Sequence, residues 1–465
     1  MNLSQVLHSR QRTTIFLIIL ALALCLLPAV TFMTHAAGSS KHAVSFTSFK
    51  NVRYAQMKSS QPPTYQQCLA TFGVPCYGPQ QIRNAYNVTP LLKDGYTGKG
   101  QSIVIIDSYG SPTIRHDLQV FDKAFGLPDP PSFKILSPLG TVAYNPTKIP
   151  DQVGWAYETT LDVEWSHALA PDANIVLMTS PVDETQGVQG MPQFLSLEKY
   201  ALDHHLGNII SQSWGTTEET LFGSGEYIID QFESLYARAV QEHVSVFASA
   251  GDAGTANPNV NGKIYPYPTV GFPASSPLVT AVGGTSLYAD PNGSYDRETV
   301  WDEVAKSGGA TGGGISRFFG EPDYQRDNLP RSAQALLNGH RGLPDVSYNA
   351  DPYTPILIYV SFVSPAGYAL IGGTSEGSPQ WAGITADANQ LAGHPLGFLN
   401  PAIYSLGNSS DYSESFHDIT VGNNGYGGIP GYKATRGWDP ATGWGSPKTA
   451  TLVTELIERI TGKGN

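Results

Sequence analysis

Apolar and polar positions along the chain form blocks that predict a repeated order of strands and helices. Short apolar runs, typical of buried strands, occupy residues 102–107, 175–178, 209–211, 244–249 and 278–282. Apolar residues at helical spacing lie between some of these runs, over residues 154–169, 193–206 and 226–242. This order predicts an α/β fold with a central parallel sheet covered by helices on both faces. Ligands of such sheets bind beyond the carboxyl ends of the strands, where Asp107, Ser213 and Asp252 are expected.

The segment 372–379 reads GGTSEGSP and runs into a helical pattern over residues 380–390. Its two glycines allow a tight turn, and Pro379 suits the first turn of a helix. Ser375 should therefore lie at a helix N-terminus, where N–H groups and the helix dipole favour developing negative charge. This is a suitable place for an acyl-transfer nucleophile, with an ordinary N-cap serine as the alternative. The letters GGTS recur at residues 283–286, but a strand end and a turn follow, so Ser286 is not the expected nucleophile.

Two carboxylates lie one turn apart on the helix predicted for residues 154–170, which Pro171 ends. Glu158 and Asp162 share the face that also carries two tryptophans and a leucine. Burying two like charges is unfavourable, so this arrangement is typical of a carboxyl with a raised pKa that exchanges protons. A solvent-exposed acidic pair is the alternative. Glu164 lies on the opposite, polar face of the helix, and we expect it at the surface.

A third carboxylate, Asp252, stands in the segment SAGDAG directly after the apolar run 244–248. An aspartate beside two glycines usually stabilises a turn. If Asp252 lay near Ser375 and were protonated, its O–H could instead donate to an oxyanion. That role would require an acidic working pH.

Composition limits the partners and the location of this chain of 465 residues. The net charge of −12 argues against nucleic acid and anionic membranes as partners. Residues 1–37 read as a signal peptide: Arg10 and Arg12 precede an apolar stretch over 15–32, and small residues follow at 34–38. We expect cleavage, secretion and no stable membrane association afterwards, with an uncleaved anchor as the alternative.

After the signal, residues 38–80 are polar and show little periodicity, so they are interpreted as an N-terminal extension or a short pro-segment. Residues 81–465 are expected to form one large domain. Cys68 and Cys76 are the two cysteines left after removal of the signal. In an exported chain they should form a small disulfide loop, with two free buried thiols as the alternative.

Together these segments resemble the sedolisins, the serine-carboxyl peptidases with a subtilisin-like fold, from about residue 77 to the C-terminus. The family's nucleophile lies in a Gly-Thr-Ser-x-x-x-Pro turn, matched by residues 373–379. Its base is a Glu one helical turn before an Asp, matched by Glu158 and Asp162, and its oxyanion-hole Asp is matched by Asp252. Subtilisins carry Asn at that last position, so Asp252 favours the acid-active branch.

The resemblance also implies residues around this centre. Asp107 and Trp214 match positions that extend the acid hydrogen-bond network in some members. Backbone edges in two segments are expected to bind the substrate as an added strand. These edges are Ser213, Trp214, Gly215, Gly312, Gly313 and Gly314.

Sedolisins carry one structural calcium ion near the C-terminus, and the matching residues here are all oxygen donors. Asp418 and Asp439 would bind through carboxylates, and Ile419, Thr435 and Gly437 through backbone carbonyls. Thr435 stands where the family often has glycine.

The resemblance implies a secreted, monomeric, acid-active serine-type endopeptidase that hydrolyses polypeptides through an acyl-enzyme on Ser375. Release of tripeptides is the other activity open to the family. Members usually carry a long folded pro-domain, whereas about forty residues separate the predicted signal from the catalytic region here.

Two rival functions remain at the level of the sequence. Asp107 and His116 could serve a subtilisin-type Ser-His-Asp triad, although His116 lies in a polar stretch without the usual glycine-bearing motif. An exported binding module on the same fold would tolerate loss of Ser375 or Glu158, yet all four expected catalytic positions are intact.

Overall fold

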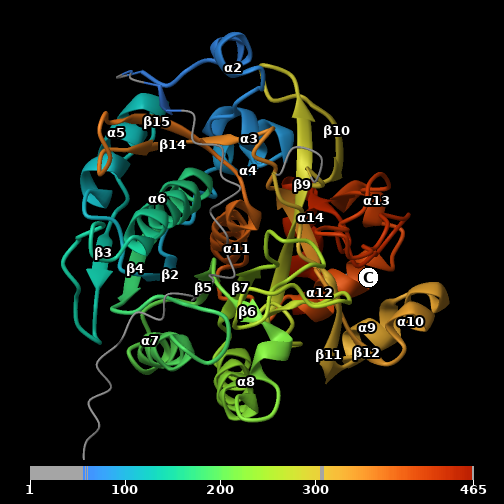
Figure 1. Cartoon of the computed structure of the whole chain (residues 1–465). Coiled ribbons are helices and arrows are strands. Elements are labelled where there is room, and N and C mark those ends of the chain that lie inside the picture. Colours follow the sequence, from blue (N-terminus) through green and yellow to red (C-terminus); the bar gives the residue numbers. More distant parts are fainter. Residues whose placement is uncertain (1–55, 58, 60, 304–307, 463–465) are drawn as a thin grey trace, which may run out of the picture. The chain divides into compact units, whose positions relative to one another are not determined.

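The computed structural model describes residues 56–57, 59, 61–303 and 308–462 (Figure 1). The predicted signal peptide, residues 1–37, lies outside this part of the chain. None of the helices within the described ranges is long and apolar enough to cross a membrane.

An eight-stranded sheet forms the centre of the described unit, in the order β10-β9-β7-β5-β2-β4-β3, with β13 also paired to β9. All neighbouring strands are parallel except β10, which lies antiparallel to β9. The parallel sheet predicted from the alternating blocks is therefore confirmed. The strands are β2 (Ser102–Ser108), β3 (Phe133–Leu136), β4 (Asn174–Ser180), β5 (Ile209–Gln212), β7 (Ser245–Ser249), β9 (Thr280–Ala289), β10 (Tyr295–Val300) and β13 (Val346–Asn349).

Helices cover both faces of this sheet, as Figure 1 shows for the pairs α6/α11 and α7/α8. The alternation of side chains along β2 explains why: Ile103 and Ile105 belong to one apolar cluster, whereas Val104 and Ile106 belong to another. The main helices are α5 (Ile114–Phe125), α6 (Asp151–Leu169), α7 (Met191–Asp203), α8 (Glu226–Gln241) and α11 (Gly377–Ala392).

Shorter elements surround this framework. They are the strands β1 (Gln56–Met57), β6 (Thr216–Thr217), β8 (Gly271–Phe272), β11 (Gly314–Gly320), β12 (His340–Leu343), β14 (Ile356–Val360), β15 (Gly367–Ile371), β16 (Phe416–His417) and β17 (Ser446–Pro447), the 3₁₀ turns η2 (Glu218–Leu221) and η4 (Thr374–Glu376), and the helices α2 (Tyr65–Phe72), α3 (Pro79–Ala85), α4 (Thr89–Lys93), α9 (Asp323–Asn328), α10 (Arg331–Leu337), α12 (Asn400–Gly407), α13 (Tyr412–Ser415) and α14 (Thr449–Thr461).

The second half of the predicted N-terminal extension packs into the same core as the sheet. Cys68 and Cys76 form a disulfide, and both lie in the apolar cluster that contains Ile103. The Tyr77 hydroxyl donates to the Leu287 carbonyl oxygen at 3.2 Å, and it accepts from the Ala289 N–H at 3.2 Å. The structured core thus begins before residue 81, and processing of the extension stays a prediction.

Helix α6 corrects one expectation, because Glu164 is fully buried rather than exposed. The polar face of α6 packs against α5 and β14, so it does not meet solvent. There the Glu164 carboxylate accepts a hydrogen bond from the Tyr359 N–H at 3.0 Å. The polar face of α6 is therefore buried against other elements and is not exposed to solvent.

Candidate active site

The turn that carries Ser375 joins strand β15, which lies outside the central sheet, to helix α11. Strand β15 ends at Ile371, the turn η4 follows, and α11 begins at Gly377. Gly373 has φ +131°, and a Cβ at this position would lie 2.8 Å from Asp252 Oδ2. A side chain here would push the Asp252 carboxyl away, so the glycine keeps it beside the turn. Ser375 is 3% exposed, at the N-terminal end of α11 as the sequence predicted.

The structure brings Asp252 directly against this turn. The backbone N–H and the hydroxyl of Thr374 each donate to Asp252 Oδ1 at 2.8 Å. Burial raises the pKa of Asp252 to about 6, although the two hydrogen bonds from Thr374 oppose the shift. Because Oδ1 already accepts twice, Oδ2 is the atom that would carry a proton at acidic pH. An O–H donor beside Gly373 and Ser375 is then available for an oxyanion.

Glu158 and Asp162 are also buried, 1% and 0% exposed. Burial raises the pKa of Glu158 well above its usual value; the Ser375 hydroxyl, a hydrogen-bonding neighbour, opposes the shift, and Asp107 adds to it. The pKa of Asp162 is also raised well above its usual value, by burial and then by the charges of Asp107 and Glu158. The Ser213 hydroxyl donates to Asp162 Oδ1 at 3.0 Å. The cluster therefore retains protons at a pH where exposed carboxyls have lost theirs.

The two residues expected to extend this network differ in their surroundings. Asp107 lies at the carboxyl end of β2, and burial raises its pKa to about 7 against the effect of the Thr159 hydroxyl. Trp214 is buried and stacks on Phe194, with 4.3 Å between the ring centroids. Within the described chain its Nε1 has no hydrogen-bond partner. Asp107 thus joins the carboxyl cluster electrostatically, and the network role of Trp214 stays a prediction.

The predicted substrate edges border the same centre. Gly312 passes so close to the Asp252 segment that a Cβ would lie 1.9 Å from the Ala250 carbonyl oxygen. The Gly312 N–H donates to the Gly251 carbonyl oxygen at 2.6 Å. Gly313 and Gly314 continue from there into β11, and Ser213 to Gly215 follow β5 on the Asp162 side. Both segments are therefore placed next to the carboxyl cluster, as expected from the sequence.

His116, the base of the rival triad, is exposed on α5, and its ring centroid lies 6.4 Å from that of Tyr359. Asp107, its supposed partner, is fully buried. No histidine in the described ranges is hydrogen-bonded to Ser375. The geometry favours a carboxyl as the neighbour of the nucleophile.

The residues expected to hold calcium fit a hard cation. The Asp418 Oδ1 atom accepts from the Gly437 N–H at 3.0 Å, and Asp439 Oδ2 accepts from the Thr435 N–H at 2.8 Å, so the two carboxylates share one loop. In the described chain, the carbonyl oxygens of Ile419, Thr435 and Gly437 accept no hydrogen bond. Oxygen atoms left without donors suit a calcium ion. No group of three or more His, Cys, Asp or Glu that could hold a metal ion occurs in the described ranges, and the calcium site stays a prediction.

Sequence reasoning missed Glu376, which follows Ser375 directly and is fully buried. Asn349 Nδ2 donates to Glu376 Oε2 at 2.9 Å, and Asn349 Nδ2 also donates to the Thr354 carbonyl oxygen at 2.9 Å. Through Asn349, Glu376 thus connects the turn that carries Ser375 to the end of β13. A single acid between small residues gives no periodic signal, so only the contacts reveal this role.

Comparisons with known proteins agree with the fold. Residues 140–402 match the model of the subtilase family, Peptidase_S8, which defines the broad class as subtilisin-like. A solved structure of Pseudomonas sedolisin, a serine-carboxyl proteinase complexed with two molecules of pseudo-iodotyrostatin, superposes with a TM-score of 0.70 at 30% identity. The match covers 84% of this chain and 99% of that chain.

Two curated relatives place the chain more narrowly within the subtilisin-like proteins. Kumamolisin of Bacillus sp. (strain MN-32) is 36% identical over 386 residues, which cover 82% of this chain and 64% of the relative. Sedolisin of Pseudomonas sp. (strain 101) is 33% identical over 365 residues, 77% of this chain and 58% of the relative. The chain belongs to the sedolisin family. It spans about three fifths of the length of these relatives.

Proposed function

We propose that this protein is a secreted, acid-active serine-carboxyl peptidase that hydrolyses peptide bonds of polypeptides. The observation that supports this most directly is the placement of Ser375 between two buried carboxyl groups, Glu158 as its hydrogen-bonding neighbour and Asp252 beside its turn. The names of the relatives, kumamolisin, sedolisin and tripeptidyl-peptidase 1, support a serine-type peptidase. An export signal at residues 1–37 supports secretion.

In the proposed reaction, the Glu158 carboxylate accepts the proton of Ser375 Oγ as that oxygen attacks the scissile carbonyl carbon. The oxyanion that forms accepts hydrogen bonds from the protonated Asp252 carboxyl and from the Ser375 N–H. Glu158 then gives its proton to the leaving amine, and the C–N bond breaks to leave an acyl-enzyme. Water then attacks the carbonyl carbon of this ester while Glu158 accepts its proton. The Ser375 oxygen leaves and takes the proton back from Glu158, which frees the acid product.

The protonation states require a pH below neutrality. Asp252 must hold a proton to donate to the oxyanion, and the pKa of about 6 places that state at acidic pH. Glu158 must be ionised to accept the proton of Ser375, and because burial raises its pKa, this charge is carried by only a fraction of the molecules at acidic pH. Asp162 would orient Glu158 and stabilise its protonated form.

In this proposal, a calcium ion stabilises the folded protein. Asp418, Ile419, Thr435, Gly437 and Asp439 would hold one ion, which supplies a fixed positive charge that organises the C-terminal loops. Removal of calcium by a chelator should lower the melting temperature, and addition of calcium, but not of magnesium, should restore it. An unchanged melting temperature at millimolar chelator would contradict the site.

The experiment that tests the function is a pH–rate profile on denatured protein substrate, comparing wild type with Ser375→Ala, Glu158→Ala and Asp252→Ala. We expect an optimum below neutrality, abolished in each folded variant, whereas His116→Ala stays active. An optimum at neutral pH that survives the loss of Glu158 would contradict the proposal and favour a histidine base.

A further inference from the structure

The residues on either side of Ser375 are both anchored through their side chains. On one side, the N–H and the hydroxyl of Thr374 each donate to Asp252 Oδ1 at 2.8 Å. On the other side, Glu376 Oε2 accepts a hydrogen bond from Asn349 Nδ2 at 2.9 Å. The reaction steps proposed above use the first anchor, through Asp252, and leave the second unexplained.

The amide of Asn349 is held in one orientation. Its Oδ1 accepts from the Leu287 N–H at 3.0 Å and from the Thr354 hydroxyl at 2.9 Å, and its Nδ2 donates to the Thr354 carbonyl oxygen at 2.9 Å. Because a backbone N–H can only donate, the amide oxygen must face Leu287, and the amide nitrogen must face Glu376. The Oε2 atom of Glu376 therefore acts as an acceptor in this contact.

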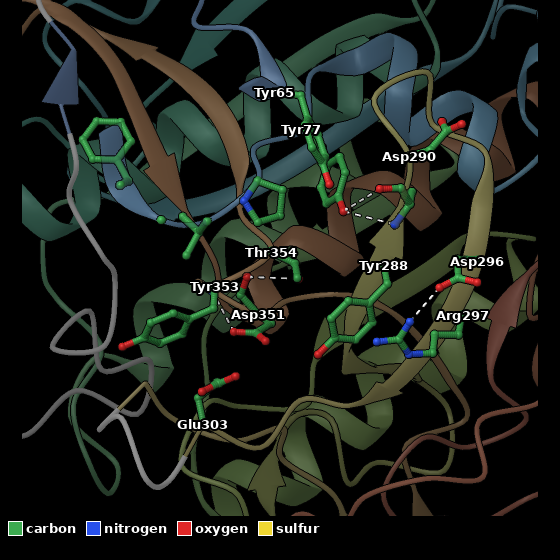
Figure 2. Close-up of a pocket in the computed structure, with 15 residues that line it drawn as sticks. Tyr65, Tyr77, Tyr288, Asp290, Asp296, Arg297, Glu303, Asp351, Tyr353 and Thr354 are labelled. Atoms are coloured by element: carbon green, nitrogen blue, oxygen red, sulfur yellow. Dashed lines mark hydrogen bonds and ion pairs between the residues drawn. The ribbon is translucent and has the colours of Figure 1, made fainter. Parts of the chain in front are cut away.

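The loop that follows Asn349 is closed by a hydrogen bond of its own and also holds the turn of the nucleophile. The Thr354 N–H donates to the Asp351 carbonyl oxygen at 2.8 Å. Both residues line a pocket of about 760 Å³, where Figure 2 shows them close together. The Ala350 carbonyl oxygen accepts from the Gly373 N–H at 2.6 Å. The turn is thus attached to this loop on both sides of Ser375, by the backbone of Gly373 and by the side chain that Asn349 binds.

The carboxyl of Glu376 is suited to an uncharged role. It is fully buried, and its second oxygen, Oε1, has no hydrogen-bond partner in the described chain. Burial raises the pKa of Glu376 well above its usual value against the effect of the Asn349 hydrogen bond, and the charges of Asp351 and Asp252 add to the shift. At acidic pH the carboxyl is therefore neutral, with its proton on Oε1, because Oε2 accepts from Asn349.

We propose that Glu376 is a positioning residue for the nucleophile: the hydrogen bond that it accepts from Asn349 fixes the peptide unit between Ser375 and Glu376, and with it the direction of the Ser375 hydroxyl. The inference rests on the proposed peptidase function and adds to it a residue that takes no part in the bond-making steps. A reacting group displaced by about 1 Å can lose on the order of 100-fold in rate. The loss of this anchor should therefore lower kcat and leave KM nearly unchanged.

The test compares two side chains of similar length at position 376, with kcat and KM measured on a peptide that wild type cleaves at acidic pH. Glu376→Gln keeps an oxygen that accepts from Asn349 and resembles the neutral carboxyl, so its kcat should stay close to wild type. Glu376→Met fills the same space without an oxygen acceptor, so its kcat should fall roughly 10- to 100-fold.

Glu198→Met is the matched control. Glu198 is also a buried carboxyl, and it lies on α7, which covers the other face of the sheet from α11. Its kcat and KM should stay close to wild type, so a fall in Glu376→Met would not be a general effect of losing a buried carboxyl. Melting temperatures show which variants are folded. If Glu376→Met does not fold, Glu376→Ala, which removes the same acceptor, takes its place in the comparison.

The glutamine variant separates positioning from packing. If Glu376→Gln loses as much kcat as Glu376→Met, or if Glu376→Met keeps the kcat of wild type, the inference is overturned, while cleavage by wild type still supports the peptidase function. A rise in KM with an unchanged kcat would also overturn it, because the residue would then act on substrate binding. If wild type cleaves no peptide at any pH, the peptidase function fails, and the inference fails with it.

Discussion

The two faces of helix α6 carry the same kind of residue under different constraints. One face presents Glu158 to Ser375, the proposed nucleophile, and Asp162 to Ser213, and the other face presents Glu164 to β14. All three carboxyls are 1% exposed or less, and burial raises the pKa of each well above its usual value. Burial and a raised pKa therefore do not distinguish a catalytic acid from a structural one here.

The partners of the carboxyls do distinguish the two faces. On the structural face, the backbone N–H of Tyr359 donates to Glu164. On the opposite face, the donors are the hydroxyls of Ser213 and Ser375. Glu158 and Glu164 each keep one oxygen, Oε1, without a partner in the described chain, so the difference lies in the donors. A carboxyl with fixed backbone donors is held in one state, whereas one among hydroxyls can exchange a proton with a reacting group.

The largest difference in kcat should come from replacing one carboxyl by a neutral amide on each face of α6 in turn. Glu158→Gln removes the base but keeps the shape, so kcat should fall by roughly 1,000-fold or more. Glu164→Gln, the matched control, should keep activity close to wild type at acidic pH, since an uncharged amide still accepts from the Tyr359 N–H. Initial rates at the acidic optimum measure both effects.

Thermal unfolding of the same variants checks that each protein is folded. If Glu164→Gln lost activity as strongly as Glu158→Gln while its melting temperature stayed normal, the division of α6 into two roles would be wrong.

A smaller effect should follow from Asp162→Asn. Asp162 would act through Glu158, so an amide that still accepts from Ser213 should lower kcat by roughly 100-fold and leave KM nearly unchanged. The pH profile should also shift, because one member of the coupled cluster no longer titrates. A uniform rise in KM with an unchanged profile would instead indicate a role in substrate binding.

The structural face should control how stability depends on pH. Burial, and to a lesser degree Asp129, raises the pKa of Asp122 from 3.8 to about 8 in the folded protein. A group with a raised folded pKa stabilises the fold fully below its unfolded pKa, and this contribution is lost as pH rises through the folded pKa. The Asp122 contribution should therefore decrease the free energy of unfolding as pH rises from about 4 to about 8.

Asp122→Asn should make that decrease shallower by an amount on the order of a few kcal/mol, measured by denaturant unfolding across this range. His167 opposes this decrease between about pH 4 and pH 6.5, because burial lowers its pKa from 6.5 to about 4 and the unfolded state therefore binds more protons over that range. Its Nε2 lies 2.8 Å from the Pro128 carbonyl oxygen, an acceptor only. The 3.4 Å separation of His167 and Asp122 is thus a contact between neutral groups at mildly acidic pH. Equal pH slopes for wild type and Asp122→Asn would contradict this account.

Much of the fold was accessible from the sequence because periodicity reports burial directly. The strand over residues 102–107 was predicted almost to its ends, since a strand covered on both faces is apolar throughout. Ser286 was correctly separated from Ser375, because a strand and not a helix surrounds it. The meeting of Asp252 with the Ser375 turn depends on contacts across 122 residues, and the sequence supplied it only through a family resemblance.

The residues whose burial or contacts the sequence did not predict have a common feature: each depends on tertiary packing. Glu164 lies on a polar face that periodicity assigns to solvent, yet α5 and β14 cover it. Residues 38–80 showed little periodicity as a whole, yet Cys68, Cys76 and Tyr77 within them are buried, and Tyr77 is fixed by hydrogen bonds to β9. Glu376 matters through Asn349, which no local pattern can reveal.

The attachment of the N-terminal segment has a consequence for the order of assembly. The Tyr77 hydroxyl bonds to the carbonyl of Leu287, 210 residues later, and β1 pairs with Tyr368 and Ala369 of β15. A chain synthesised from its amino end contains this segment long before its partners exist. Its docking must therefore be a late event, delayed by loop closure over most of the polypeptide, and the first part made is among the last to find its place.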